Sequence, residues 1–300
     1  MEKKQRLILV VASVENGEGK RTLRFKKEAE KLNLEVIVIN SYKCKLTEKS
    51  IICEGNEVVL RKNDVCWCIS NSMVNHYIAY HLQLKGIFVW PSIEAINFSD
   101  KFMTNTFFSN IGVDTPRTAL VNSISKESIQ EVAENVGGFP CVIKGNKGSM
   151  GKSVEIVNSE DDAIAFIKDI MSSVGKNSIP FKKISFQLQE FIAESVGEDF
   201  RIICLQGEIV GGVKRVAQDG FKANISLGGK AELFEVDEPL KCICKRIMEK
   251  GNIFYAGIDF IKSKRGYLAI EVNSSSQFQG FEERTKINVA REILKKITKN

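Results

Sequence analysis

The chain has 300 residues, 43% of them hydrophobic and only 5 of them proline, so it carries enough apolar side chains for proper cores and is not a disordered protein. Lysine and arginine number 43 against 37 aspartates and glutamates, and the net charge of +6 is spread along the whole sequence. This distribution argues against a dedicated nucleic-acid-binding or membrane-surface protein, and the small positive excess suits a small anionic ligand.

The first third of the chain alternates short apolar runs with amphipathic segments, as α/β proteins do. The expected strands cover residues 7–12, 34–39, 65–69 and 86–90, and the expected helices cover 20–33 and 75–84. In the first helix we expect Leu23, Ala29 and Leu32 to face inward. The alternation predicts a small parallel α/β domain at residues 1–92, without the Gly-x-Gly-x-x-Gly fingerprint of a dinucleotide fold.

Residues 93–184 are predicted to form a second unit. The expected helices cover 99–111, with Ser99 or Asp100 as its cap, 125–136 and 159–171, and the expected strands cover 117–121, 139–144 and 153–157. The last two strands flank a glycine-rich loop, so this unit contains a long hairpin followed by a helix.

The glycine-rich loop over residues 144–153 is similar to a Walker A motif but has Asn146 where that motif needs glycine, and it joins two strands rather than a strand and a helix. A P-loop is therefore a poor interpretation. Gly145, Gly148 and Gly151 would let the backbone N–H groups fold over a triphosphate as a lid, while Lys144 supplies a point charge. An ordinary hairpin turn with exposed lysines is the alternative.

Residues 185–300 are predicted to form a third, largely antiparallel unit with two helices. The expected strands cover 185–190, 199–205, 208–216, 257–261 and 267–273, and the expected helices cover 240–250 and 288–298. Turns at Gln206-Gly207 and Arg265-Gly266 predict hairpins between consecutive strands.

Oxygen ligands gather on two of these strands. The strand period of two places Ala269, Glu271 and Asn273 on one face, and Asp259 lies on the neighbouring hairpin strand between apolar residues. Hard oxygen ligands of this kind are what Mg²⁺ on nucleotide phosphates requires. The alternative is that Asp259 and Glu271 are outward polar residues of half-exposed strands.

Cationic side chains gather on the strands beside them. Asp199 and Arg201 share a strand face, Lys214 and Arg215 end the next strand, and Asn224 lies in a loop rich in glycine and serine. Buried arginines are costly without anions, so we expect a carboxylate or phosphate between them. For Lys214, surface ion pairing is an equally good interpretation.

In chain order these features resemble the ATP-grasp ligases, specifically the RimK and LysX type that adds amino acids to carboxylates. The resemblance extends over about residues 87–294 and rests on Lys101, Lys144, the loop to Lys152, Gln189-Glu190-Phe191-Ile192, Gly197 to Arg201, Lys214-Arg215, Asn224, Gly228-Gly229, Asp259 and Glu271-Val-Asn273. It implies the ATP-grasp fold, with a small N-terminal parallel α/β domain, a central lid subdomain at 93–184 and a C-terminal antiparallel α+β subdomain at 185–300 holding the magnesium and substrate site.

The resemblance also implies residue roles. The implied ATP site comprises Lys101, Lys144, Gly148, Ser149, Gly151, Glu190, Phe191, Ile192, Asp199 and Lys214, with the backbone of Glu190 and Ile192 at the adenine and Asp199 at the ribose. Asp259, Glu271 and Asn273 are implied to hold two Mg²⁺ ions, with Mn²⁺ as a substitute. Arg201, Arg215 and Asn224 are implied to grip the carboxyl substrate and stabilise its transition state.

Two loops depart from the family pattern, and they leave the substrates open. Asn273-Ser-Ser-Ser-Gln277 stands where the family usually has Asn-x-x-Pro-Gly, and residues 222–227 stand where RimK-type ligases show Arg-x-Asn-x-His-Arg. The expected activity is the ADP-forming ligation of a carboxylate and an amine through an acyl phosphate. The substrates are expected to be small molecules, with a peptide or carrier-protein terminus as a further option for one of them. An inactive nucleotide-binding regulatory module and a small-molecule kinase remain alternatives.

The remaining polar residues favour a simple cellular context. The eight cysteines lie in apolar segments with neither zinc-site nor disulfide-framework spacing, so most are expected to be reduced core thiols. His76 and His81, five residues apart on a predicted helix, do not share a face and predict no histidine site. With no signal-type start and no long apolar run, we expect a cytoplasmic protein without membrane or nucleic-acid partners. The sequence leaves a homo-oligomer open.

Overall fold

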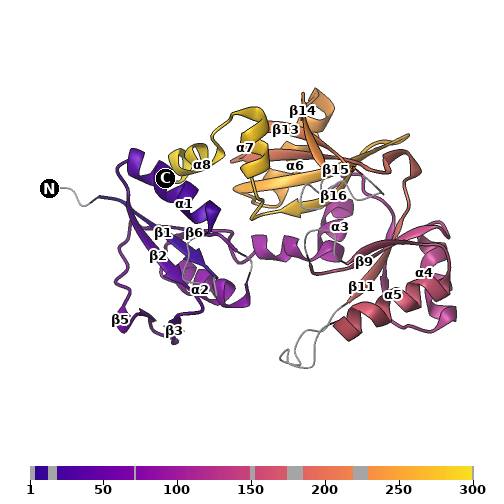
Figure 1. Cartoon of the computed structure of the whole chain (residues 1–300), viewed down its shortest axis with the longest axis horizontal. Coiled ribbons are helices and arrows are strands. Elements are labelled where there is room, and N and C mark those ends of the chain that lie inside the picture. Colours follow the sequence, from indigo (N-terminus) through magenta and orange to yellow (C-terminus); the bar gives the residue numbers. More distant parts are fainter. Residues whose placement is uncertain are drawn as a thin grey trace.

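The computed structural model describes residues 4–12, 19–70, 72–148, 153–173, 185–218 and 229–298. Within them the chain forms a parallel sheet, two larger antiparallel sheets and a small antiparallel hairpin sheet. The parallel sheet lies at one end of the molecule and the two antiparallel sheets lie at the other, where α3 (Lys101–Asn110) lies beside β16 (Gly266–Asn273) (Figure 1). The ATP-grasp fold predicted from the sequence has this arrangement.

The N-terminal sheet has the strand order β2-β1-β6-β7, and all its neighbours are parallel. Its elements are β1 (Arg6–Val11), α1 (Lys20–Lys31), β2 (Glu35–Asn40), β6 (Val65–Cys68), α2 (Met73–Leu84) and β7 (Phe88–Trp90). The central strand β1 buries both of its faces, because Leu7, Ile8, Leu9 and Val10 are all fully buried. A continuous apolar run is the pattern that a strand covered on both sides requires.

The inward face of α1 differs from the prediction. Phe25 and Ala29 are fully buried and Thr22 nearly so, whereas Leu23 is 53% exposed. The buried positions follow the spacing i, i+3, i+7, which continues to the partly buried Leu32. Leu23 lies just outside this stripe, so assigning it to the core was wrong.

A second difference is a hairpin sheet inserted between β2 and β6. It consists of β3 (Cys44–Leu46), β4 (Ile51–Cys53) and β5 (Asn56–Glu57), in which Cys44 and Cys53 are directly opposite and form a disulfide. Neither the strands nor the pairing was predicted, because the segment is short and carries no clear alternation. The other six cysteines are free thiols, and all but Cys242 are buried, as expected.

The central sheet has the strand order β10-β9-β11-β8 and is antiparallel throughout. Its elements are β8 (Thr118–Val121), α4 (Lys126–Val136), β9 (Cys141–Gly145), β10 (Val154–Val157), α5 (Glu160–Ser173) and β11 (Phe186–Glu190). Ile143 and Leu188, on one face, pack in a core with residues of α4 and α5. Lys144, Gln187 and Gln189 are therefore on the other face.

The C-terminal sheet has the order β14-β13-β12-β15-β16. Its elements are β12 (Glu198–Leu205), β13 (Glu208–Val216), β14 (Lys230–Phe234), α6 (Glu238–Lys250), β15 (Tyr255–Ser263), β16 (Gly266–Asn273), α7 (Gln279–Thr285) and α8 (Val289–Ile297). Of these, β14 and α7 were not predicted. Two short 3₁₀ turns, Ala95–Ser99 and Ala193–Ser195, complete the described elements. The helix α3, which the sequence assigns to the central segment, contacts β16 of this sheet.

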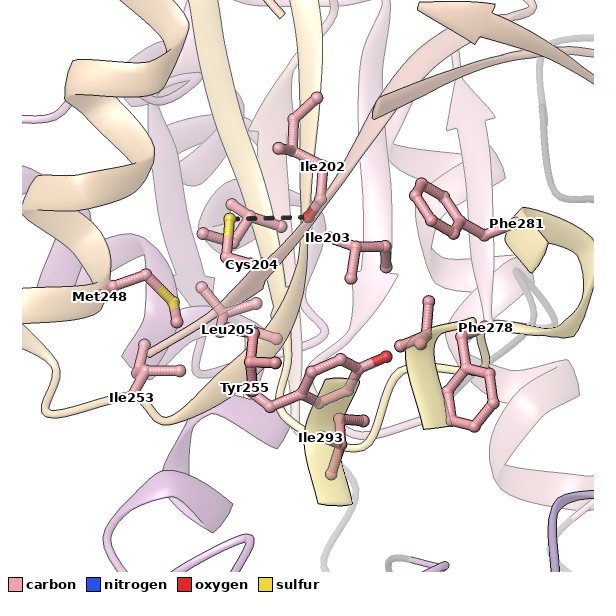
Figure 2. Packing of buried hydrophobic residues seen from close by; sticks show 14 of the residues in the cluster. Ile202, Ile203, Cys204, Leu205, Met248, Ile253, Tyr255, Phe278, Phe281 and Ile293 are labelled. Carbon is pink, nitrogen blue, oxygen red and sulfur yellow. Dashed lines mark hydrogen bonds between the residues drawn. The ribbon is translucent and has the colours of Figure 1, made fainter. Parts of the chain in front are cut away.

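The core of the C-terminal sheet continues into the N-terminal domain. Tyr255 is fully buried beside Leu205, Ile293 and Phe278 (Figure 2). Its ring centroid lies 5.5 Å from that of Trp67 on β6, and the Phe25 ring of α1 lies 5.7 Å from that of Phe278. The predicted boundary at residue 92 thus separates segments that share one hydrophobic cluster.

No helix in the described ranges combines the length and the apolar character needed to cross a membrane.

Truncating Ile202 should measure how much the hydrophobic core of the C-terminal sheet contributes to stability. Ile202 lies on β12 with its side chain fully buried, so Ile202→Ala should lower the free energy of unfolding by about 2 to 5 kcal/mol. Leu233→Ala is the matched control, because Leu233 belongs to the same sheet but is 69% exposed. Urea unfolding followed by tryptophan fluorescence gives both values, and equal losses would contradict the packing described.

Candidate functional site

One face of the C-terminal sheet carries a row of alternating charges. Direct cross-strand partners bring them together, since Asp199 is opposite Arg215 and Arg201 is opposite Asp259. Arg201 donates from Nε to Asp259 Oδ1 at 2.7 Å and from Nη2 to Oδ2 at 2.6 Å. Arg215 binds Asp199 through Nε and through Nη2, the latter at 2.7 Å, and its Nη2 also lies 3.1 Å from Asp259 Oδ2.

These ion pairs are buried. Asp259 is 2% exposed and Arg215 is 3% exposed. Burial works to raise the pKa of Asp259, but the charges of Arg201 and Arg215 outweigh it and hold that pKa below its usual range. Burial dominates at Asp199, whose pKa is raised despite its bonds to Arg215. Asp259 is thus the firmly anionic member of the row.

The predicted oxygen ligands meet at the end of this row. Asp259 is opposite Glu271, and Asn273 Nδ2 lies 3.3 Å from both Asp259 Oδ2 and Glu271 Oε2. The sequence placed Ala269 on the same face as Glu271, which was wrong. A β-bulge shifts the register between Asp259 and Phe260, so that Ala269 pairs with Phe260 and takes the opposite face.

The donor set suits a hard divalent cation. Two carboxylates each lie within hydrogen-bond distance of the same amide group, and all three side chains can offer oxygen. The described residues hold no group of three or more histidine, cysteine, aspartate or glutamate side chains that could bind a metal ion. This cluster, with only two carboxylates of its own, therefore fits a cation that a bound anionic group also helps to coordinate.

Two lysines approach from the other side. Lys101 is 9% exposed at the start of α3, and its Nζ lies 3.2 Å from Glu271 Oε1 and 2.9 Å from the carbonyl oxygen of Gly148. Lys144 on β9 donates to Gln189 Oε1 at 2.6 Å. Burial, helped by the charge of Lys101 and opposed by Glu271, lowers the pKa of Lys144 to about 8. The carboxylates and the lysines thus lie where the two antiparallel sheets face each other.

The lowered pKa of Lys144 predicts a pH-dependent anion site. Below pH 8 the ammonium is charged and attracts a phosphate, and above it the charge is lost, so the affinity for Mg-ATP should fall as pH rises from 7 to 9. Equilibrium binding of a fluorescent ATP analogue across this range measures the effect. Lys144→Arg keeps the charge and should flatten the profile, whereas parallel profiles would exclude Lys144 as the titrating group.

Three polar residues of the same region were given no role in the site on the basis of the sequence. Gln187 is fully buried on the face that carries Lys144, and among the described residues neither its Oε1 nor its Nε2 has a hydrogen-bond partner. Gln189 accepts the hydrogen bond from Lys144 and donates to Thr118 Oγ1 at 2.9 Å, and Asn146 Oδ1 is buried with no partner in the described part of the chain. The signal was present, since two glutamines at a spacing of two in an apolar strand share one face.

The predicted adenine segment lies at the end of β11. The Glu190 carboxylate binds Arg265 at 2.7 Å and Arg117 at 3.3 Å, so its side chain is occupied and its backbone N–H donates to the Arg117 carbonyl. Phe191 follows, and Ile192 is buried, with its carbonyl accepting from Ser195. Backbone contacts to a base thus remain a prediction for this segment.

Lys214 does not join the charged row. It is opposite Phe200, on the other face of the sheet from Arg215, and its Nζ binds Glu198 Oε1 at 2.6 Å. Grouping Lys214 with the two arginines was wrong, because adjacent strand residues point to opposite faces. The surface ion pair left open for Lys214 is what the structure shows.

Several predicted site residues lie outside the described part of the chain. They are Ser149 and Gly151 of the predicted lid at 146–152, Asn224, and the rest of the atypical loop 222–227. Of that lid, Asn146, Lys147 and Gly148 are described, and Gly148 adopts a positive φ of 137°. His76 and His81 both lie on α2 of the N-terminal domain.

The serine loop after Asn273 is held by the N-terminal domain. Trp90 Nε1 donates to the Ser274 carbonyl at 2.8 Å, Ser275 Oγ donates to the Ile69 carbonyl at 3.3 Å, and Arg21 Nη1 donates to the Ser275 carbonyl at 3.1 Å. Tyr255 donates from its hydroxyl to the Ser276 carbonyl at 3.2 Å. The loop that departs from the family pattern is therefore firmly anchored beside the carboxylate cluster.

Sequence comparison identifies relatives over most of the chain. The model of the RimK-like ATP-grasp domain matches residues 98–297. A protein of Legionella pneumophila (strain Corby), described as a "probable alpha-L-glutamate ligase", is 30% identical over 284 residues, which are 92% of this chain and 90% of the relative.

Solved structures share the fold at lower identity. The RimK-domain ATP-grasp protein of Sphaerobacter thermophilus superimposes with a TM-score of 0.72 at 15% identity, covering 97% of this chain and 98% of that one. The ATP-grasp ligase PsnB, complexed with a phosphomimetic variant of a minimal precursor, Mg and ADP, gives a TM-score of 0.70 at 16% identity, covering 99% and 100%.

Proposed function

This chain belongs to the RimK-like ATP-grasp family and is an ATP-dependent carboxylate:amine ligase, and we propose that it joins the amino group of L-glutamate to a carboxylate through an acyl phosphate. The choice of glutamate is supported by the relative named as a glutamate ligase. The carboxylate substrate is proposed to be a small molecule or a peptide, as the PsnB complex with a precursor exemplifies for that protein.

The observation that carries the proposal is the convergence of the buried charges from two sheets. Asp259, Glu271 and Asn273 would hold the Mg²⁺ ions, two in number and replaceable by Mn²⁺, on the side where Lys101 reaches Glu271. Bound there, the cations would neutralise the triphosphate and polarise its terminal phosphoryl group. Lys144, opposite Gln187 on the facing sheet, is proposed to bind the same phosphates.

The proposed reaction has two displacements. A carboxylate oxygen attacks the γ-phosphorus, the bond from that phosphorus to the bridging oxygen breaks, and ADP leaves. The amine then attacks the acyl carbon, phosphate leaves with the C–O bond electrons, and the nitrogen loses a proton to solvent. Arg201, Arg215 and Asn224 are proposed to orient the carboxylate and to offset charge on the oxyanion, an effect worth about 3 to 4 kcal/mol per donor.

The structure limits what the two arginines offer to a substrate. The Nε and Nη2 atoms of Arg201 and Arg215 already bind Asp259 and Asp199. The Nε–Nη2 edge of each guanidinium is therefore occupied, and the Nη1 atoms are the ones proposed to reach a carboxylate oxygen. The bonds to the aspartates fix the orientation of each guanidinium, so each Nη1 donor is held in a defined position.

An amine-dependent ADP release assay tests the proposal. The purified chain is incubated with Mg-ATP, a panel of dipeptides and small carboxylates, and L-glutamate, and ADP and phosphate are measured with and without hydroxylamine. A ligase releases ADP in proportion to the amine and yields a hydroxamate with hydroxylamine. A kinase releases ADP without the amine and gives no hydroxamate, and a regulatory module releases no ADP.

A further inference from the structure

Arg21 is a partly buried cation at the start of α1. Its Nη1 donates to the carbonyl oxygen of Ser275 at 3.1 Å and lies 3.4 Å from the Ser275 hydroxyl. Burial lowers the pKa of its guanidinium, which the neighbouring Tyr255 only partly opposes. Both acceptors are neutral, so the hydrogen bonds do not neutralise the charge.

The other arginines of this region have an anion. Arg24, one turn later on α1, binds Glu282 at 2.9 Å and Glu28 at 2.6 Å, and Arg201 and Arg215 bind aspartates. Across the part of the chain that the structure describes, Arg21 forms no ion pair with a carboxylate and its Nε and Nη2 form no hydrogen bond. A desolvated cation is costly unless an anion neutralises it, and the described residues supply none, so the Nε–Nη2 edge is suited to an anion from outside.

Arg21 and Arg201 lie around the same loop. Ser275 follows the proposed metal ligand Asn273 by two residues, and a Cβ added at Gly257 would lie 2.8 Å from Ser276 Cβ and 3.4 Å from Arg201 Cδ. This close approach explains why position 257 is glycine. The charges of both Arg21 and Arg201 act on Tyr255, whose hydroxyl binds the Ser276 carbonyl.

We propose that Arg21 binds a free carboxylate of the amino acid that serves as the amine substrate, and that it sets the requirement for an acidic amine. The inference rests on the proposed ligase function and deepens it. The Nε–Nη2 side of a guanidinium matches a carboxylate bidentately, and Nη1 is already fixed by the serine loop. An amino acid held here reaches the site from the N-terminal domain, on the side where the serine loop adjoins the carboxylate cluster.

The division of charge supports this assignment. Arg201 and Arg215 each use the Nε–Nη2 edge of the guanidinium on an aspartate, so neither offers that edge to a second carboxylate. L-Glutamate used as the amine has two carboxylates and needs a cation of its own. Arg21 supplies that cation beside the serine loop.

Substrate amides separate recognition of a carboxylate from a merely structural role. Steady-state ligation is measured for wild type, Arg21→Ala and Arg21→Lys with L-glutamate, L-glutamine and L-isoglutamine as amines. Wild type should prefer L-glutamate over at least one amide by tenfold or more in kcat/KM. Arg21→Ala should lose that preference, raise the KM for L-glutamate at least tenfold and leave the KM for ATP within twofold, with Arg21→Lys between the two.

The controls distinguish a failure of the inference about Arg21 from a failure of the proposed ligase function. Lys20→Ala removes a charge from the adjacent, exposed position and should leave every ratio unchanged. Ser275→Ala removes the hydroxyl beside Nη1 and should raise the KM for L-glutamate a few-fold, which serves as the readout if Arg21→Ala does not fold. Equal losses for the acid and both amides would reduce Arg21 to a loop anchor and overturn the inference, although ligation itself persists. Absence of amino-acid-dependent ADP release by wild type would instead overturn the proposed function together with the inference.

Discussion

Replacing Glu271 with glutamine should lower the rate of ligation by about three orders of magnitude at saturating ATP. The substitution keeps the shape of a partly exposed side chain but removes one of the two carboxylate charges in the cluster with Asp259 and Asn273. A cation held there is expected to supply several kcal/mol of charge stabilisation, and about 4 kcal/mol corresponds to this factor. Multiple-turnover ADP release at saturating Mg²⁺ gives the rate.

The binding of ATP should suffer far less than turnover, because the lysines proposed to contact the phosphates are unchanged. Glu238→Gln, an exposed change at the start of α6 in the same subdomain, is the matched control and should ligate normally. Asp259→Asn should be equally inactive and also less stable, because it leaves two buried arginines without their shared anion. Near-wild-type ligation by Glu271→Gln would remove Glu271 from the metal site.

Arg215→Lys should lower kcat by about two orders of magnitude while the affinity for nucleotide changes little. Lysine keeps the positive charge but cannot bind Asp199 through two nitrogens and also reach Asp259. The change therefore disturbs the arginine that is proposed to face the carboxylate substrate and the aspartate that is proposed to face the cation. Two orders of magnitude correspond to about 2.7 kcal/mol in the transition state.

Stability has to be measured in the same experiment, since Arg215 is almost completely buried. Thermal unfolding identifies the temperature at which the variant is fully folded, and kinetics are compared there. Arg246→Lys serves as the control, because Arg246 is exposed and its one hydrogen bond to the described residues is to the Gly112 carbonyl. If folded Arg215→Lys binds ATP weakly but turns over normally at saturation, Arg215 belongs to the nucleotide site instead.

The period of two in the strands predicted much of this site. It correctly placed Glu271 with Asn273 and Asp199 with Arg201, and the structure then brought Asp259 and Arg215 onto the same face by direct cross-strand pairing. The sequence of one strand does not determine the register in which it pairs with its neighbour. The bulge that displaces Ala269 depends on pairing with β15, which no local pattern encodes.

Contacts between distant segments were the other limit. That the Nε–Nη2 edges of Arg201 and Arg215 bind aspartates follows from their cross-strand neighbours, and the neutral acceptors of Arg21 Nη1 belong to a loop about 250 residues away. The ion pair that Lys214 forms with Glu198 was an open alternative, because the sequence alone weighs it equally with an anion site. The resemblance to the family identified which residues matter, and only the fold indicates which atoms remain available.

The hydrophobic cluster shared by the first and last parts of the chain has a practical meaning for dissecting or recombining this ligase. A fragment ending at residue 92 would leave Trp67 and Phe25 without Tyr255 and Phe278, and the remaining fragment would leave the serine loop without Trp90 and Arg21. Each fragment expressed alone should aggregate, whereas the two co-expressed should reassemble. An exchange of N-terminal segments between relatives, made to transfer amine preference, would have to carry its matching loop 274–277 with it.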